Sequence, residues 1–482
     1  MARRGPLTPV DLVESDEPTE SPAPQPAARR GRRWWLWAVP VAAVGIALGV
    51  QQVADARSRA ADARIAALPG AIAPLGERLE VRWRLADGMT APAVDGPVAN
   101  DRLHGAVGSA GGATSYDALD LRTGERAWST PLTGPDADPP TPGGAMCTAD
   151  PGVEPERVVC LVIEGDLSSS ENGGDGTQMP TGSRVVVLDL ADGRVLADHP
   201  IIPTVSIAVL PGLVAAATIG DDRHLVVVAT DPLTGEELWR YRHADPVRGV
   251  VDPGSTFITG IGDLAVVLNL TGGAVLVSAS GERVEEDTET DSWGMTSQGR
   301  FYLDRPDPDG VGRLQRVFLP GRPPLEVRGQ LLERAVDDGS VPGLEVSIGD
   351  KAYGWDGRTG ERLWAADVGA SSGWRETVLI LEGTVYLSAG ERVVALDART
   401  GASRWTAPGV ADGSSAELLT DGAHILLVES ADAEDGAATV TVLDRRDGTL
   451  VRRLATPDGV YLALAAGRYL VGAGEQGMVG LG

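Results

Sequence analysis

The fold is decided by the stretch Ala118-Leu119-Asp120-Leu121-Arg122-Thr123-Gly124-Glu125-Arg126-Ala127-Trp128. A small residue is followed two positions later by aspartate, then by a Thr-Gly pair, and finally by tryptophan four positions after the glycine. The same order returns in near-complete copies at Ala229–Trp239, Gly354–Trp364 and Ala395–Trp405. Weaker copies at Asp189–Ala197 and Asp444–Arg452 keep the turn residues and lose the indole. The chain is therefore built from an internal repeat, which points to a modular fold.

Each copy predicts two β-strands joined by a tight turn. The residues before the aspartate are apolar and β-branched, as in Val185–Leu188 and Val440–Leu443, which favours a strand. Aspartate can accept backbone N–H groups of the turn, and glycine takes the positive-φ position. Further short strands, such as 378–381 and 385–388, lie between copies. Four antiparallel strands in ~42 residues predict a propeller blade.

The tryptophans are expected to dock neighbouring blades against each other. The chain has 11 Trp but only 3 Phe, a bias that ordinary cores do not show. A fixed indole in each blade would remove about 150–250 Å² from water, worth about 4–6 kcal/mol as an upper bound. The predicted docking residues are Trp83, Trp128, Trp239, Trp364 and Trp405.

The repeat pattern resembles the tryptophan-docking motif of pyrroloquinoline-quinone-type (PQQ-like) β-propeller repeats. That family includes quinoprotein dehydrogenases and the non-enzymatic outer-membrane assembly propeller. The resemblance covers about residues 79–482. It implies an all-β propeller, and the family usually closes its ring with eight blades.

Ring closure and blade number follow from the motif spacing. The last strands (460–465, 469–472 and 478–481) have no Trp strand after them, and Trp83 has no strands before it. Together they predict a composite blade that ties the ends of the chain. Counting blades from the ends of the motif copies gives nine units. The 125-residue interval between Trp239 and Trp364, however, contains degenerate repeats. Because the resembled family usually closes with eight blades, we predict eight, with seven to nine possible and a misread unit expected within 245–345.

The N-terminal region predicts a membrane anchor. Residues 1–33 are Pro-rich and acidic and end in Arg29-Arg30-Gly31-Arg32-Arg33, and residues 34–53 carry no charge. Such a run matches the ~20 residues that cross a bilayer as a helix, and the arginines favour a cytoplasmic N-terminus. We predict a disordered cytoplasmic tail (1–33), a transmembrane helix (34–53), an extracytoplasmic stalk (54–76) and a propeller (77–482). A signal peptide cleaved near Ala54-Asp55-Ala56 is the alternative.

Cys147 and Cys160 are the two cysteines of the chain. Outside the membrane, an even count with strands on both sides predicts a disulfide between adjacent strands of the second blade. Two free buried thiols are the alternative.

Recognisable catalytic and metal-binding patterns are missing from the sequence. The resemblance would require a vicinal Cys pair, Glu and Asn ligands for Ca²⁺ and an Asp base, but the cysteines are not vicinal. Neither the asparagines nor the histidines show ligand spacing; they are Asn100, Asn172, Asn269, His104, His199, His224, His243 and His424. The Asp-rich stretches 304–310 and 432–436 suit turns better than a Ca²⁺ loop, and 164–182 suits a tolerated insertion. We expect no catalytic residues, cofactor or metal.

The net charge of −26 argues against a nucleic-acid partner, because phosphate binding needs a basic surface. The sequence thus predicts a non-catalytic binding or scaffolding module, anchored in the cell membrane and displayed outside the cytoplasm. Its partner would be an unknown extracytoplasmic protein or small ligand. A quinone-dependent dehydrogenase or another enzyme with an unrecognised site, and an extracytoplasmic sensor, are the alternatives.

Overall fold

The computed structural model describes residues 51–482 except 54, 87, 94–95, 110–111, 135–144, 150–154, 165–179, 181, 248–255, 270–272, 288–291, 296–299, 307–312, 320–321, 370–376, 410–415, 431–436 and 475–476. The chain divides into two compact units, Met1–Ser58 and Arg59–Gly482. No helix among the described residues is both long and apolar enough to cross a membrane. Of the predicted span 34–53, all but residues 51–53 lies outside the described residues.

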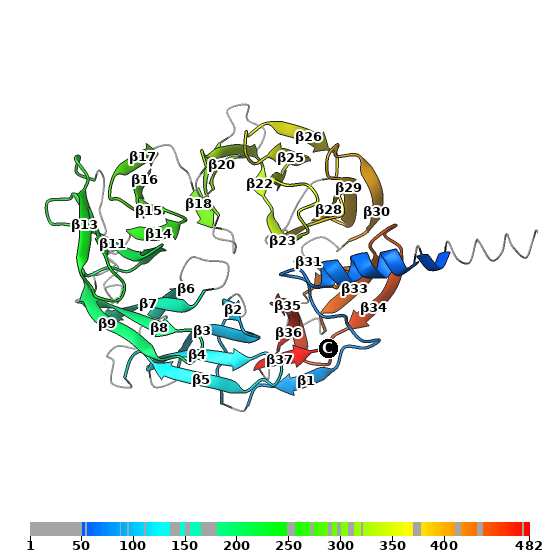
Figure 1. Ribbon diagram of the computed structural model, residues 1–482, viewed down its shortest axis with the longest axis horizontal. Helices are drawn as coiled ribbons and strands as arrows, with labels where there is room; N and C mark the ends of the chain where they lie inside the picture. Colours follow the sequence, from blue (N-terminus) through cyan, green and yellow to red (C-terminus); the bar gives the residue numbers. More distant parts are fainter. Residues whose placement is uncertain are drawn as a thin grey trace, which may run out of the picture. The chain divides into compact units, whose positions relative to one another are not determined.

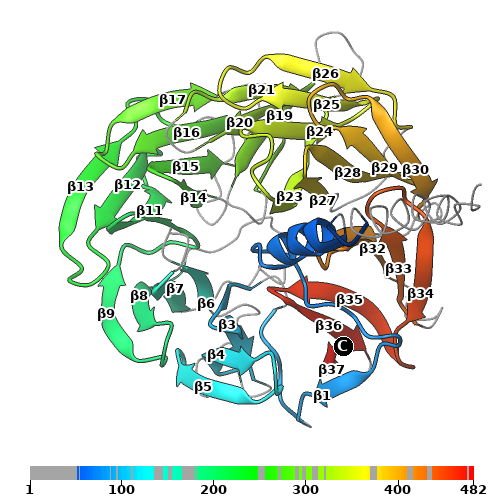
Figure 2. The same ribbon diagram turned by 45° about the vertical axis from the view of Figure 1, so that its right-hand side comes forward.

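The second unit is a ring of β-sheets, as Figures 1 and 2 show. Its described strands form nine sheets, which we call blades 1–9 in chain order; all strand pairs are antiparallel except one in blade 7. Blades 1 to 3 are β2 (Val98–Ala99), β3 (Arg102–Gly108), β4 (Thr114–Asp120), β5 (Arg126–Pro131); β6 (Ala145–Ala149), β7 (Arg157–Glu164), β8 (Gly182–Asp189), β9 (Val195–Ile201); and β10 (Ile207–Leu210), β11 (Leu213–Ile219), β12 (Leu225–Thr230), β13 (Glu237–Arg242). Blades 4 to 6 are β14 (Phe257–Ile261), β15 (Leu264–Asn269), β16 (Gly273–Ser278), β17 (Arg283–Asp287); β18 (Ser292–Met295), β19 (Phe301–Pro306), β20 (Arg313–Phe318), β21 (Leu325–Arg328); and β22 (Gln330–Leu331), β24 (Leu344–Ile348), β25 (Ala352–Asp356), β26 (Arg362–Ala366).

The remaining three blades complete the ring. Blades 7 to 9 are β23 (Glu333–Asp337), β27 (Thr377–Leu381), β28 (Thr384–Ala389), β29 (Arg392–Asp397), β30 (Ser403–Pro408); β31 (Ala416–Thr420), β32 (His424–Glu429), β33 (Thr439–Asp444), β34 (Leu450–Ala455); and β35 (Val460–Ala466), β36 (Tyr469–Gly474), β37 (Gly477–Leu481), β1 (Val81–Arg84). In Figure 1 the first strands of the blades, such as β6, β14 and β18, lie toward the middle of the ring, and the last strands form its rim.

The all-β propeller is confirmed, but the prediction of eight blades is wrong, because the described strands form nine sheets. The interval 245–345, where a misread unit was expected, contains blades 4 and 5 as complete four-stranded sheets and the start of blade 6. Blades 4 and 5 have no motif tryptophan on their last strands, so the spacing of indoles passes over them.

The ends of the chain meet in blade 9. Strand β1 pairs with β37 in antiparallel register, with Trp83 opposite Gly480. Glu80 and Gly482 exchange two further backbone hydrogen bonds of 3.1 Å. The composite blade therefore closes the ring through strand pairing.

The hydrophobic core lies between blades. In β27, Val378 and Ile380 join a cluster with blade 6 side chains, whereas Leu379 and Leu381 join a cluster with blade 8. Successive side chains of a strand point to opposite faces, and here both faces are covered. This explains why the inner strands read as continuous apolar runs rather than as alternating ones.

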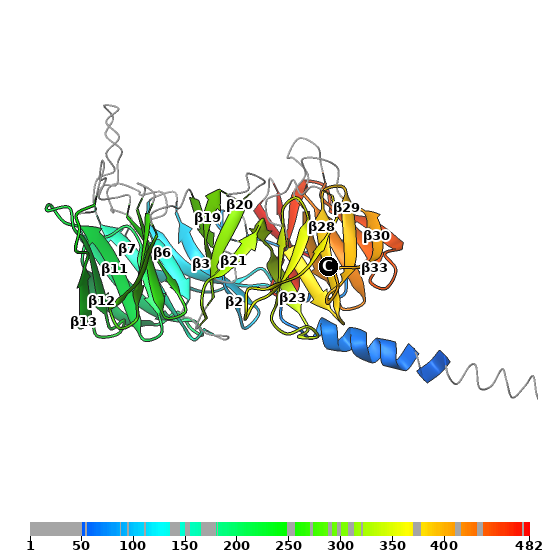
Figure 3. The same ribbon diagram turned by 90° about the horizontal axis from the view of Figure 1, so that it is seen from above.

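Residues 59–76 pack on the ring. Residues 59–66 are helical, and Ile65 is buried in the cluster between blades 7 and 8. Ile72 donates its backbone N–H to the carbonyl of Thr420 at 2.9 Å. Gly422 (φ +95°) permits the close approach, because a Cβ atom there would lie 2.3 Å from the carbonyl oxygen of Asp62. Figure 3 shows the helix against one face of the ring.

Candidate functional site

The turn of each repeat is held by its aspartate. Asp397 accepts backbone N–H groups from Arg399 and Thr400, both at 3.1 Å. Arg404 donates to its second carboxylate oxygen at 2.8 Å, and this bond is the main reason that the pKa of Asp397 falls to about 2. The turn places Gly401 at φ +71° facing the preceding blade. The aspartate thus shapes a surface on which a neighbouring side chain can rest.

Four indoles rest on turns of this shape; three of the turns have the aspartate, and the turn under Trp239 has Ser278 in its place, whose hydroxyl accepts the Glu282 N–H at 3.2 Å. Trp364 of blade 6 donates its Nε1–H to the carbonyl of Ala398 in blade 7 at 2.9 Å, and its ring covers Gly401. Trp83, Trp239 and Trp405 donate to the carbonyls of Leu121 (2.7 Å), Ala279 (2.7 Å) and Arg445 (3.2 Å). Their rings cover Gly124, Gly281 and Gly448. Each therefore lies at a seam, the interface between two neighbouring blades.

Trp128, at the seam of blades 1 and 2, is arranged differently. Its ring covers Gly193, but its Nε1–H has no hydrogen-bond partner among the described residues. Thr130 donates instead to the Gly193 carbonyl at 2.6 Å. The indole packs against His104 and Tyr116, with ring centroids 5.5 and 6.0 Å away. Burial lowers the pKa of His104 and raises the pKa of Tyr116, so both rings are held neutral.

A histidine takes the place of tryptophan at the seam of blades 2 and 3. His199 lies on β9, two residues beyond the position of the motif indole, which Ala197 occupies. Its Nε2 lies 3.0 Å from the carbonyl oxygen of Pro232, and its ring covers Gly235. The sequence reasoning missed this residue. The signal that could have identified His199 is an aromatic ring two residues after the motif position, since this residue projects from the same face of the last strand of the blade.

Three other seams use different groups. Leu325 covers Gly360 between blades 5 and 6. At the seam of blades 8 and 9, Arg452 occupies the position of the motif indole and donates to the carbonyl of Leu75 at 2.9 Å. Blade 9 joins the two ends of the chain and has no repeat turn at this place. Glu285 and Arg316 form an ion pair between blades 4 and 5.

Blades 4 and 5 are also joined by an aromatic stack that contains every phenylalanine of the chain. Phe257 stacks on Trp293 with ring centroids 4.9 Å apart. Trp293 in turn contacts Phe301 at 6.3 Å, and Phe301 contacts Phe318 at 5.8 Å. This stack supplies the aromatic contact that the missing motif tryptophans provide elsewhere.

The inner end of this stack is exposed. Trp293 and Met295, both on β18, have 41% and 49% of their surface accessible. Thr259 of β14 donates to the Met295 sulfur at 3.7 Å. Strands β14 and β18 lie on the inner side of the ring (Figure 1). We call Phe257, Trp293 and Met295 the aromatic platform; it is the candidate binding site.

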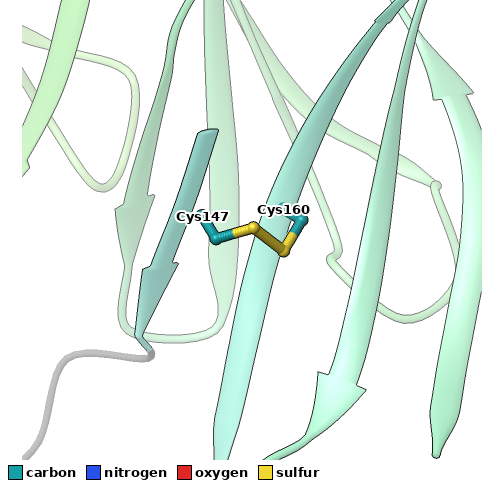
Figure 4. The surroundings of a disulfide bond; sticks show 2 residues. All are labelled: Cys147 and Cys160. Carbon is teal, nitrogen blue, oxygen red and sulfur yellow. A yellow bond between two sulfur atoms is a disulfide. The ribbon is translucent and has the colours of Figure 1, made fainter. Parts of the chain in front are cut away.

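The predicted disulfide is present in the structure. Cys147 on β6 lies directly opposite Cys160 on β7, and their sulfur atoms are 2.08 Å apart (Figure 4). Because this pair links two strands across a sheet, it does not provide the vicinal pair that would stack on a quinone.

The described residues contain no group of three or more His, Cys, Asp or Glu side chains that could hold a metal ion. Asn100 lies in the β2–β3 turn at φ 53°, and the side chains of Asn172 and Asn269 lie outside the described residues.

The other candidate residues have local roles. His224 bonds the His243 carbonyl (2.9 Å), His243 bonds Tyr241 (2.9 Å), and His424 pairs with Asp421 (2.9 Å). Asp304, buried in β19, accepts from the Ser292 hydroxyl at 3.0 Å. The stretch 432–436 and nearly all of the insertion 164–182 lie outside the described residues.

Comparison with known proteins supports the predicted family resemblance. Residues 282–460 match the family model described as outer membrane protein assembly factor BamB. The solved structure of BamB from Moraxella catarrhalis aligns with a TM-score of 0.39 at 14% identity, covering 84% of this chain and 97% of that one. Quinohemoprotein alcohol dehydrogenase ADHIIG from Pseudomonas putida HK5 aligns with a TM-score of 0.40 at 15% identity, covering 88% and 78%. The family match over residues 282–460 confirms the predicted resemblance to the PQQ-like β-propeller repeat.

A curated relative matches over a short segment. The serine/threonine-protein kinase AfsK of Streptomyces griseus is 40% identical over 82 residues, which is 16% of this chain and 10% of AfsK. This chain thus spans about a tenth of the length of that relative.

Proposed function

We propose that this chain is a non-catalytic binding or scaffolding module, anchored in the cell membrane with its propeller outside the cytoplasm. One observation carries the binding role: Trp293 is held by Phe257 at 4.9 Å and yet exposes 41% of its surface on an inner strand. A rigid exposed indole is a typical anchor for a protein partner. The description of the family matched by residues 282–460, an assembly factor, supports the same role.

The anchor is supported by the sequence of the N-terminal region. Arginines at 29, 30, 32 and 33 precede the uncharged run 34–53. The Cys147–Cys160 disulfide suits an oxidising compartment. Alkaline phosphatase fused after residue 76 should be active and the same enzyme fused after residue 28 inactive. The reverse pattern, or activity at both positions, would reject this topology.

The non-catalytic assignment is supported by the position of the cysteines, which link two strands and leave no vicinal pair. An absorbance scan of the purified protein with added quinone and Ca²⁺ tests it. A cofactor band accompanied by dye reduction would establish an enzyme instead.

The binding role is tested by photo-cross-linking in intact cells. Benzoylphenylalanine in place of Trp293 should give one discrete adduct, because the partner covers this position. The same probe in place of Leu363, a rim residue that is 46% exposed, is the control. Adducts at both positions, or at neither, would contradict the platform as the binding site.

A sensor role is the second candidate. It is favoured by Arg445, whose side chain holds Asp62 of the N-terminal helix while its carbonyl accepts the Trp405 indole. Truncation of residues 1–28 should then alter signalling or growth under envelope stress. An unchanged phenotype would reject the sensor role.

A further inference from the structure

We propose that the free edge of β18, the edge that faces the middle of the ring, binds an extended segment of a partner protein as an added β-strand. The aromatic platform would contact the side chains of this segment. This inference rests on the proposed binding role and specifies the partner: a chain segment in β conformation with apolar side chains at alternating positions.

The first support is the position of β18 in its sheet. Blade 5 has the order β18-β19-β20-β21, so β18 is the edge strand on the inner side of the ring. Within the described part of the chain it pairs with β19 alone. An edge strand presents backbone N–H and C=O groups that can pair with another chain.

The second support is a precedent within the same ring. In blade 7, a fifth strand, β23, pairs with the edge of β27 that faces the middle of the ring. The two strands are parallel, from Glu333 opposite Thr377 to Asp337 opposite Ile380. Strand β23 arrives from the inner strand of blade 6 and returns to that blade. The space along an inner edge of this ring is therefore wide enough for an additional strand.

The inner strand of blade 5 is unusually exposed. In β27, which carries β23, every residue after Thr377 is buried. Strand β10 of blade 3 is fully buried without a fifth strand. In β18, by contrast, exposed and half-buried residues alternate, with Trp293 and Met295 exposed. Strand β18 therefore combines an open edge with exposed apolar side chains.

The exposed side chains define the chemistry of the partner. Trp293 and Met295 are two residues apart and so project from the same face of β18. An added strand would place its own alternating side chains beside them, which favours apolar residues at positions i and i+2. Phe257 stacks on Trp293, so little side-chain freedom is lost on binding. Met295 can adapt to different apolar partners.

Strand β6 provides a matched comparison. Met146, on the inner strand of blade 2, is 41% exposed, the same fraction as Trp293. Met146 lies in blade 2, whereas the platform residues lie in blades 4 and 5, and its neighbour Cys147 is tied to β7 by the disulfide. A substitution at Met146 therefore removes equal apolar exposure from an inner strand without touching the platform.

The test is a selection from a phage-displayed library of random dodecapeptides on the purified full-length protein. Enriched peptides should carry apolar residues at alternating positions. Their affinity should fall at least about tenfold for the double variant Trp293→Leu/Met295→Ser and stay unchanged for Met146→Ser. N-methylation of alternate backbone amides in the selected peptide should abolish binding, because strand pairing needs those N–H groups. A thermal melt of each variant identifies any loss of affinity that comes from unfolding.

Three outcomes would overturn strand addition: enriched peptides without the alternating pattern, equal affinity for the double variant, or full binding after N-methylation in either register. These results differ from a failure of the proposed function. A discrete adduct at position 293 with binding that tolerates N-methylation would keep the binding role and reject the added strand. Absence of both an adduct and enriched peptides would reject the two together.

Discussion

Arg445 and Asp62 are separated by 383 residues in the sequence, yet their side chains form an ion pair of 2.9 Å. Arg445 is buried, and its other terminal nitrogen donates to Glu382 at 2.7 Å. Its backbone carbonyl accepts hydrogen bonds from Trp405 (3.2 Å) and Tyr386 (3.1 Å). One residue thus connects the N-terminal helix with the seam of blades 7 and 8.

The substitution Asp62→Asn should release the helix. It removes the charge that pairs with Arg445, and amide exchange in residues 62–72 should become at least about tenfold faster, equivalent to about 1.4 kcal/mol. Hydrogen exchange followed by mass spectrometry measures this change. Arg446→Gln is the control, because Arg446 is 56% exposed and contacts Asp62 at 3.4 Å. Equally faster amide exchange in both variants would show that the ion pair with Arg445 does not hold the helix in place.

The substitution Gly401→Ala should weaken the seam of blades 6 and 7. A methyl group there would lie 2.9 Å from Cε3 of Trp364, in a backbone at φ +71°. Gly383→Ala is a matched control, since Gly383 has the same φ and no atom within 4 Å of the added Cβ. Both should lose about 1–2 kcal/mol from the backbone strain, and Gly401→Ala should lose about 1–3 kcal/mol more from overpacking. Urea denaturation compares them; equal losses would contradict tight docking.

The substitution His199→Ala should destabilise the seam of blades 2 and 3 by about 1.5–3 kcal/mol, because it removes a hydrogen bond and the ring that covers Gly235. His224→Ala is the comparison. His224 bonds the carbonyl of His243 at 2.9 Å within blade 3 and covers no turn glycine, so its loss should cost about 0.5–1.5 kcal/mol. Denaturation midpoints of the two variants measure the difference. A smaller loss for His199→Ala would mean that it is not a docking residue.

Stability should decline in mild acid because of His104. Burial lowers its pKa below the ordinary value of 6.5, and the nearby Arg102 acts in the same direction. Below pH 6.5 the unfolded chain therefore binds a proton that the folded chain does not, and the free energy of unfolding falls until the pH reaches the folded pKa. Unfolding measured between pH 8 and pH 5 should show a shallower decline in His104→Gln than in the wild type. Identical slopes would exclude His104 as a source of the acid sensitivity.

Reduction of the disulfide should lower stability by about 3 kcal/mol. The linked residues are 13 apart, and closing a loop of this size restricts the unfolded chain. Urea unfolding with and without dithiothreitol measures the loss. The variant Cys147→Ser/Cys160→Ser should match the reduced protein and be unaffected by reductant. Unchanged stability after complete reduction would contradict this role of the bond.

The repeat aspartates, glycines and tryptophans predicted the architecture because each combines a turn with a contact to the next blade. They could not predict the seam of blades 4 and 5, where Phe257, Trp293, Phe301 and Phe318 replace the motif and no fixed spacing marks them. The spacing of the motifs gave nine units, and the prediction of eight was wrong because it followed the usual blade number of the resembled family. The composite blade 9 was predictable. The sequence leaves one unpaired strand at each end of the repeat region, and in a closed ring these two strands can pair with each other.

The binding platform and the helix contact depend on tertiary position. The sequence before Trp293 lacks the Asp and Thr-Gly of the motif, but it does not reveal that the indole is exposed, because the exposure is set by the inner location of β18. Strand β23 leaves blade 6 to pair with blade 7, a detour that no local pattern encodes. His199 replaces an indole from two residues away, so a search with the motif alone passes over it.

The pairing of β1 with β37 has a consequence for biosynthesis. Strand β1 waits for its neighbour until β37 has been synthesised, since Val81 meets Leu481. The other eight blades can assemble on the emerging chain, but the circle stays open until β37 arrives. A nascent chain stalled before β37 would therefore expose unpaired strand edges, and such a truncated product should be a preferred substrate for quality-control proteases.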